Sequence, residues 1–133
     1  MEKLVISILS AYMGMGIFFS FYIAPLLFRM LERSKAGSIV ENIFPVYFAI
    51  GIATVFISLL VSFFSSLGKK VYIPLLLALL LLIILEFYIV PTAHELKTTN
   101  YSAFMRFHTY SVALNVITML LILISLFFIL RRK

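Results

Sequence analysis

The residue with the clearest chemical potential in this sequence is Glu86, an acid that interrupts an otherwise apolar segment. Counting back from Pro91 at 3.6 residues per turn places Glu86 about one and a half turns inside a helix. A carboxylate in apolar surroundings either pairs with a base or is protonated. The candidate partners are Arg29, Arg106 and His108. Glu86 is therefore predicted to bind a proton or cation, or to form a structural ion pair.

Four polar residues share one face of a predicted helix at the spacings i, i+3, i+7 and i+10, namely His108, Ser111, Asn115 and Thr118. This face is expected to point into the protein, where it would form a hydrophilic track or a ligand-binding wall. The alternative is hydrogen bonding between helices, which such side chains commonly provide in membranes. Hydrogen bonding is favoured for Ser111, Asn115 and Thr118. A functional role is favoured for His108, which lies close to Arg106.

The two histidines, His94 and His108, could ligate a haem or a copper ion if neighbouring helix ends brought them together. The pattern is weak, because no third ligand, no metal-spaced histidine pair and no cysteine accompany them. A loop histidine such as His94 is usually solvated. No cofactor is therefore predicted, and a haem- or metal-binding membrane redox protein is retained as an alternative.

A further group of candidates surrounds the first predicted loop. Ser38 and Glu41 have the spacing of a helix capping box, so the second helix is expected to begin near residue 39 as an amphipathic turn and to bend at Pro45. Turn chemistry accounts for Ser38 and Glu41 but not for the gathering of Arg29, Pro45 and Tyr47. Arg29 and Tyr47, with Glu41 beside them, are therefore predicted to bind a ligand.

These residues must be positioned by helices long enough to cross a membrane. Hydrophobic residues make up 64% of the chain and charged residues 12%, whereas roughly a quarter of the residues in a soluble domain are charged. The apolar residues fall in four long stretches, and about 20 residues suffice to cross the hydrocarbon core. We predict an all-α polytopic membrane protein: a single domain over residues 1–133, with a bundle of four transmembrane helices at 4–28, 39–65, 71–91 and 103–130 and no internal repeat.

Four spans place both termini at one end of the bundle, called end A, together with the loop near Gly68; end B carries the other two loops. End A holds six Lys and Arg residues and end B holds five. Because basic residues favour the cytoplasmic side, both termini are predicted to be cytoplasmic in the cell membrane. Four of the five acids and both histidines lie at end B, which predicts a functional site there. The net charge of +6 lies at helix ends facing lipid headgroups, so a nucleic acid partner is not expected.

Other features favour structure over catalysis. Small residues recur every three to four positions in two predicted helices, which permits close packing within the bundle or between protomers; they are Gly16, Ser20 and Ala24 in the first helix and Gly51, Thr54, Ser58 and Ser62 in the second. The sequence has no nucleophile elbow, phosphate loop, HExxH or dinucleotide-binding motif, and it contains neither cysteine nor aspartate. An enzyme is therefore not the favoured interpretation.

Two parts of the sequence resemble the transmembrane-protein-205-like family of small four-helix membrane proteins. One is GIFFSFYIAPLLFR at 16–29 with the following Ala36-Gly37 and IFPVY at 43–47; the other is FMRFH at 104–108 with the following Ser111 and Asn115. The resemblance covers nearly the whole chain and implies a four-span bundle without a defined activity. Its animal member is linked to drug resistance. At the level of motifs the resemblance extends to Gly16, Pro25, Arg29, Gly37, Pro45, Tyr47, Arg106, His108 and Asn115.

The leading hypothesis is a non-enzymatic membrane protein whose polar site at end B binds or translocates a small polar or anionic solute or a lipid headgroup. Positive charge would come from two arginines and proton-sensitive hydrogen bonds from the other polar groups. The candidate residues are Arg29, Glu41, Tyr47, Glu86, Arg106, His108 and Asn115. Four helices rarely enclose a pore alone, so transport would require a homo-oligomer. The remaining alternative is a structural subunit of a larger membrane complex.

Overall fold

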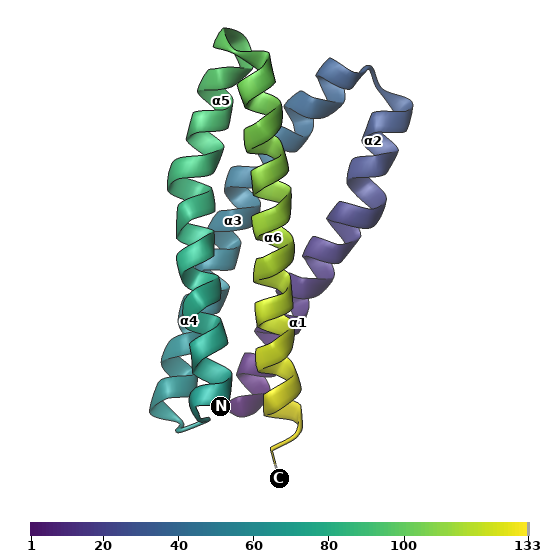
Figure 1. Ribbon diagram of the computed structural model, residues 1–133. Helices are drawn as coiled ribbons and strands as arrows, with labels where there is room; N and C mark the ends of the chain where they lie inside the picture. The colour runs from purple at the N-terminus through teal and green to yellow at the C-terminus, as the bar shows by residue number, and fades with distance from the viewer. Residues whose placement is uncertain (133) are drawn as a thin grey trace.

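The computed structural model describes residues 1–132, which form helices joined by short turns and contain no strand. Four helices are long and apolar enough to cross a membrane: Glu2–Met30, Arg33–Phe64, Lys69–Thr99 and Tyr101–Leu130. Each has 29 to 32 residues, which at 1.5 Å per residue gives a length of about 45 Å, more than the roughly 30 Å hydrocarbon core. The predicted all-α architecture of four membrane-crossing helices is therefore confirmed, with both termini at end A (Figure 1).

Two of the four helices contain a turn of wider π-helix. The first consists of α1 (Glu2–Phe18), η1 (Phe19–Ile23) and α2 (Ala24–Met30), and the third of α4 (Lys69–Ile84), η2 (Leu85–Ile89) and α5 (Val90–Thr99). The second and fourth, α3 (Arg33–Phe64) and α6 (Tyr101–Leu130), are continuous. Each π turn ends two residues before a proline, Pro25 or Pro91. Because proline cannot donate to the preceding turn and its ring crowds the carbonyl there, a wider turn accommodates it.

Two helices extend further toward end B than the sequence indicated. The helix α3 begins at Arg33 with Glu32 at its N-cap, so Ser38 lies inside the helix and the predicted capping box is wrong. The third helix continues past Pro91 to Thr99, because the wider π turn before this proline accommodates its ring and its missing N–H. The turn that follows is held by Asn100, whose side chain accepts a hydrogen bond from the Ala103 amide at 3.2 Å.

The first and third helices carry an internal repeat, contrary to the prediction of none. Both π turns end in the same three residues, and the pentapeptides FYIAP at 21–25 and FYIVP at 87–91 differ at one position and are spaced 66 residues apart. The same spacing relates buried positions along both helices: Val5 and Val71, Leu9 and Leu75, Tyr12 and Ala78, Gly16 and Leu82, and Phe19 and Leu85. The chain is thus two similar helical hairpins, hairpin 1 (residues 2–64) and hairpin 2 (residues 69–130).

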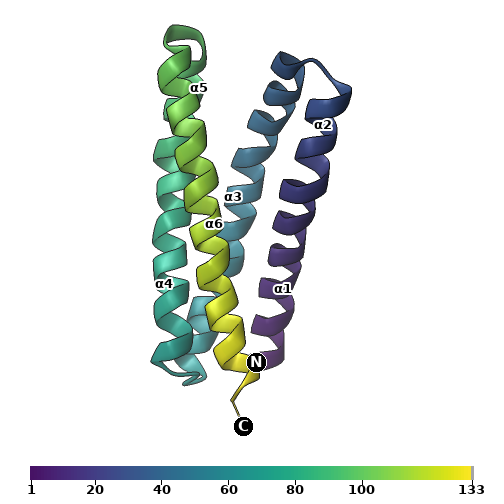
Figure 2. The same ribbon diagram turned by 45° about the vertical axis from the view of Figure 1, so that its right-hand side comes forward.

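The two hairpins pack tightly at end A and separate toward end B (Figure 1, Figure 2). At end A the fully buried side chains of Val5, Val71, Leu75 and Ile129 belong to the core shared by both hairpins. Toward end B, no Cα atom of α2 lies within 8 Å of one in α6, both elements being wholly within the described residues. The fold therefore opens between its hairpins at the end where the sequence placed the functional site.

Candidate binding cavity between the two hairpins

A cavity of about 600 Å³ lies between the two hairpins at end B and is called the end-B cavity. Its polar lining consists of Arg33, Ser34, Glu41, Lys97, His108 and Ser111. Aliphatic and aromatic side chains form most of the remaining wall, among them Phe28, Phe44, Ile89, Tyr101 and Phe104. A cavity with a few polar groups on an apolar wall is the usual form of a site for a small organic ligand.

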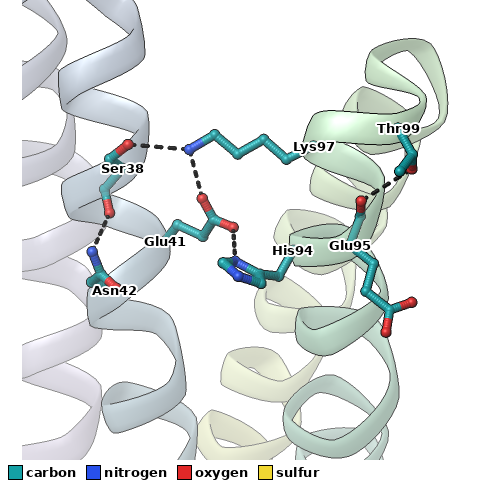
Figure 3. Close-up of polar contacts among 7 residues, drawn as sticks. All are labelled: Ser38, Glu41, Asn42, His94, Glu95, Lys97 and Thr99. Carbon is teal, nitrogen blue, oxygen red and sulfur yellow. Dashed lines mark hydrogen bonds and ion pairs between the residues drawn. The ribbon is translucent and has the colours of Figure 1, made fainter.

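The two hairpins are bridged beside this cavity by a cluster of hydrogen bonds, called the rim cluster. One carboxylate oxygen of Glu41 on α3 accepts a hydrogen bond from Lys97 Nζ at 2.8 Å, and the other lies 2.7 Å from His94 Nδ1. The Lys97 ammonium also donates to Ser38 Oγ at 3.1 Å. Figure 3 shows His94 and Lys97 reaching from α5 toward Glu41, while the neighbouring Glu95 points away. The Glu41 side chain is 16% exposed, so its charge is compensated where water has limited access.

His108 forms part of the deeper wall of the end-B cavity. Its imidazole lies beside two phenylalanine rings, Phe44 on α3 and Phe104 on α6, each with a ring centroid 6.3 Å away and nearly parallel. The side chain is half-buried, and the next turn of α6 places Ser111 Oγ 2.7 Å from the His108 carbonyl oxygen, to which it donates. The two aromatic rings fix the orientation of an imidazole that can hydrogen-bond a ligand in the cavity.

A second cavity of about 450 Å³, called the lateral groove, lies between the first helix, α3 and α6. It extends along α6 from His108 to Leu123 and is almost entirely apolar. Its polar lining consists of Ser20, His108, Ser111 and Asn115. Several of its wall residues are exposed hydrophobic side chains, including Phe21 and Val116. The groove therefore lies open on the outer surface of the helix bundle.

Two tyrosines and two glycines lock α1 against α3 beneath the cavities. The rings of Tyr12 and Tyr47 stack with centroids 5.0 Å apart. Each tyrosine hydroxyl lies so close to a glycine of the opposite helix that a Cβ atom there would overlap it, Tyr47 over Gly16 and Tyr12 over Gly51. The Tyr47 hydroxyl donates to Asn115 Oδ1 on α6 at 3.2 Å, while the Tyr12 hydroxyl has no hydrogen-bond partner among residues 1–132. The small residues thus allow close approach of specific tyrosines.

The structure brings some of the predicted site residues together and separates others. Glu41 and His108 line the end-B cavity, and Asn115 lines the lateral groove and bonds Tyr47. Arg29 and Arg106 are exposed and line neither the end-B cavity nor the lateral groove.

Glu86 occupies the π turn η2 and is partly exposed. Within residues 1–132 it forms no ion pair and no side-chain hydrogen bond, so the predicted pairing with Arg29, Arg106 or His108 is not formed.

His94 and His108, the candidate ligands of the haem or metal alternative, lie in different surroundings. His94 contacts Glu41 in the rim cluster, whereas His108 lies beside two phenylalanine rings. In the part of the chain that the structure describes, no group of three or more His, Cys, Asp or Glu side chains is placed to hold a metal ion.

Sequence reasoning missed Arg33 and Lys97 as cavity residues. Both follow from helix ends that lie beyond the predicted ones: α3 starts early enough to include Arg33, and α5 continues far enough to present Lys97 one turn after His94. The signal available in the sequence was the i, i+3 spacing of His94 and Lys97, which puts an imidazole and an ammonium on one helix face. This spacing was overlooked because Pro91 was taken as the end of the helix.

Comparison with known proteins places the chain in a family. No solved structure matches it. An "Uncharacterized protein" of Aquifex aeolicus (strain VF5) is 47% identical over 123 residues, which cover 92% of this chain and 91% of that protein. Residues 7–102, from α1 to the start of α6, match the family model described as "Domain of unknown function (DUF4149)". The chain therefore belongs to the DUF4149 family.

Proposed function

We propose that this protein is an integral membrane protein that binds a small molecule with a polar or anionic group in the end-B cavity. The observation that carries the proposal is the end-B cavity itself, a space of about 600 Å³ with charged groups near its rim and His108 in its deeper wall. This volume falls within the range of about 300–1,000 Å³ typical of small-molecule sites.

The charges that line the cavity favour an anionic ligand over a cationic one. Arg33 and Lys97 contribute two positive charges and Glu41 one negative charge. Lys97 is already engaged by Glu41 at 2.8 Å, whereas Arg33 forms no ion pair with any residue of the described part of the chain. A free guanidinium has the planar pair of donors that carboxylates and phosphates accept.

The proposal includes an orientation and an assembly. End A has more Lys and Arg residues than end B, which supports a cytoplasmic end A. The cavity at end B would then lie on the extracytoplasmic side of the cell membrane. Binding requires a single copy, whereas translocation of the ligand would require a homo-oligomer or relative movement of the two hairpins. The resemblance to the transmembrane-protein-205-like family agrees with a small four-helix membrane protein of this kind.

Cysteine labelling tests the proposal, because the chain contains no native cysteine. Ala93 lines the end-B cavity, whereas Thr98 is exposed on the same helix and lies outside the cavity lining. The variants A93C and T98C would each be reacted with an anionic and a cationic methanethiosulfonate reagent of similar size.

An anion-selective cavity predicts an anionic-to-cationic rate ratio at A93C at least about threefold higher than at T98C, because a charged concave site concentrates counter-ions. The additional change Arg33→Gln should lower the ratio at A93C and leave that at T98C unchanged. Equal ratios at the two positions would refute an anion-binding cavity.

A further inference from the structure

The end-B cavity and the lateral groove adjoin each other around His108. They share five lining residues: Phe28 from α2, Val40 and Phe44 from α3, and His108 and Ser111 from α6. On the end-B side of His108 the space is lined by charged groups, including Arg33 and Lys97. Below His108 its wall is apolar apart from three side chains, Ser20, Ser111 and Asn115. The combined space thus has a polar part and an apolar part.

The apolar part is open to the surroundings of the helix bundle. Four of its wall residues are 50% exposed or more, namely Phe21, Val116, Leu120 and Leu123. The gap between α2 and α6 leaves an opening along the side of the bundle. In a bilayer this opening faces lipid, and hydrocarbon chains are the molecules available to fill an apolar groove there.

The length of the groove fits one hydrocarbon chain of one leaflet. Along α6 its wall runs from His108 to Leu123, a rise of about 22 Å at 1.5 Å per residue. Half of the hydrocarbon core is about 15 Å thick. The groove is therefore long enough for one acyl chain that descends from end B past His108.

We infer that the groove and the cavity together bind one anionic membrane lipid, which enters sideways between α2 and α6. Its headgroup phosphate lies in the end-B cavity near Arg33, and one acyl chain lies along α6 in the lateral groove. This inference rests on the proposed function and specifies its ligand. Charge complementarity supports an anionic headgroup, because the ionised side chains that line the cavity are two bases and one acid.

Tryptophan fluorescence tests the inference, because the chain contains no native tryptophan. The variant V116W places a tryptophan in the lateral groove, and L80W places one at an equally exposed position on α4 outside both cavities. Each purified variant in detergent would be titrated with phosphatidylglycerol that carries bromine atoms on its acyl chains, since bromine quenches tryptophan emission on contact.

A lipid site predicts that quenching of V116W saturates at about one lipid per protein. The lipid concentration at half-maximal quenching should be at least about tenfold lower for V116W than for L80W. The change Arg33→Gln should raise this concentration for V116W about tenfold, because a charge-assisted hydrogen bond to the phosphate is lost. Equal quenching of the two variants would overturn the inference. So would equal quenching by a brominated diacylglycerol, which lacks the phosphate.

Competition separates a lipid from a free phosphate compound. Glycerol 3-phosphate has the phosphate but no acyl chain, so it should displace the brominated lipid only at a far higher concentration. Displacement at an equal concentration would identify a soluble phosphate compound as the ligand and overturn the lipid. If V116W shows no saturable quenching while A93C keeps its preference for the anionic reagent, the lipid inference fails and the proposed function stands. If V116W shows no saturable quenching and A93C shows no preference for the anionic reagent, the lipid inference and the proposed function both fail.

Discussion

In hairpin 2 the helix α5 reaches across to α3, whereas its counterpart in hairpin 1, α2, does not reach α6. The two helices follow equivalent π turns and the same FYIxP sequence, so their backbones begin alike. They differ in the side chains that follow. His94 and Lys97, which bind Glu41, occupy the positions that Phe28 and Leu31 occupy 66 residues earlier. Polar side chains in one copy of the repeat hold it to the other hairpin, and apolar ones in the other copy leave a groove.

The second helices of the two hairpins meet through a polar pair. Tyr47 on α3 and Asn115 on α6 are 68 residues apart and hydrogen-bond to each other at 3.2 Å. Both helices start at a corresponding point, Arg33 and Tyr101. Contact between equivalent positions is what two copies related by an approximate two-fold axis would make, and parallel repeats of this kind occur in membrane transport proteins. The repeated helices thus form the framework of the fold, and the positions at which the two copies differ form the candidate site.

The largest expected effect comes from Gly16→Ala, which tests the tyrosine packing that only hairpin 1 has. The added Cβ would overlap the Tyr47 hydroxyl, and the stacked, buried ring of Tyr47 has little room to move. We expect the free energy of unfolding to fall by about 2 kcal/mol, as for other overpacked sites. Thermal unfolding in detergent would measure this loss. The matched control is Gly14→Ala, whose new methyl would have no described atom within 4 Å. Equal stability of the two variants would contradict this packing.

A smaller effect is expected from Glu41→Gln, which removes the ionic bridge between the hairpins. A partly buried carboxylate with two hydrogen-bond donors should contribute about 1 kcal/mol to the free energy of unfolding. Chemical denaturation of Glu41→Gln should therefore show a loss of stability of that order. The labelling rate of A93C should rise as the cavity opens. Glu95→Gln serves as the control, because this glutamate is exposed and its carboxylate forms no ion pair within residues 1–132. If Glu95→Gln destabilises the protein as much, the rim cluster is not what links the hairpins.

A still smaller effect is expected from Glu86→Gln, which compares the two π turns. Ser20 stands at the equivalent position of η1 and lines the lateral groove, whereas Glu86 in η2 bonds no other described side chain. Replacement by the neutral amide should therefore change the unfolding free energy by less than about 0.5 kcal/mol. A loss above about 1 kcal/mol would mean that Glu86 has an ionic partner in the folded protein.

The smallest effect is expected from copying the rim cluster into hairpin 1. Thr109 and Leu31 are the equivalents of Glu41 and Lys97. In the double variant Thr109→Glu and Leu31→Lys, the new charges would lie on α6 and at the C-cap of α2, and no Cα atoms of these two helices lie within 8 Å of each other. A double-mutant cycle should give a coupling energy near zero, within about 0.3 kcal/mol. A favourable coupling would instead reveal a conformation in which hairpin 1 closes over the groove.

Much of the fold could be predicted because it depends on local sequence. The long apolar stretches required four helices. Both histidines and three of the five acids lie toward end B as predicted, whereas Glu86 lies near the middle of the third helix. Helix ends were harder, since the effect of a proline depends on its position. Pro91 was read as a stop, yet the preceding π turn lets the helix continue to Thr99 and present His94 and Lys97. The FYIxP repeat was visible in the sequence, and its matched burial pattern became evident only with the structure.

The sequence by itself determined that this chain forms four membrane-length helices with its histidines and most of its acids toward end B, because hydropathy and charge act along the chain. Only the tertiary structure decided which of those groups meet. Arg29 and Arg106 have the same charge as Arg33 and Lys97, but the rotation of each helix turns the first pair outward and the second pair toward the cavity. That rotation is set by packing against other helices, such as Tyr47 over Gly16 and Tyr12 over Gly51, and these contacts join residues distant in sequence.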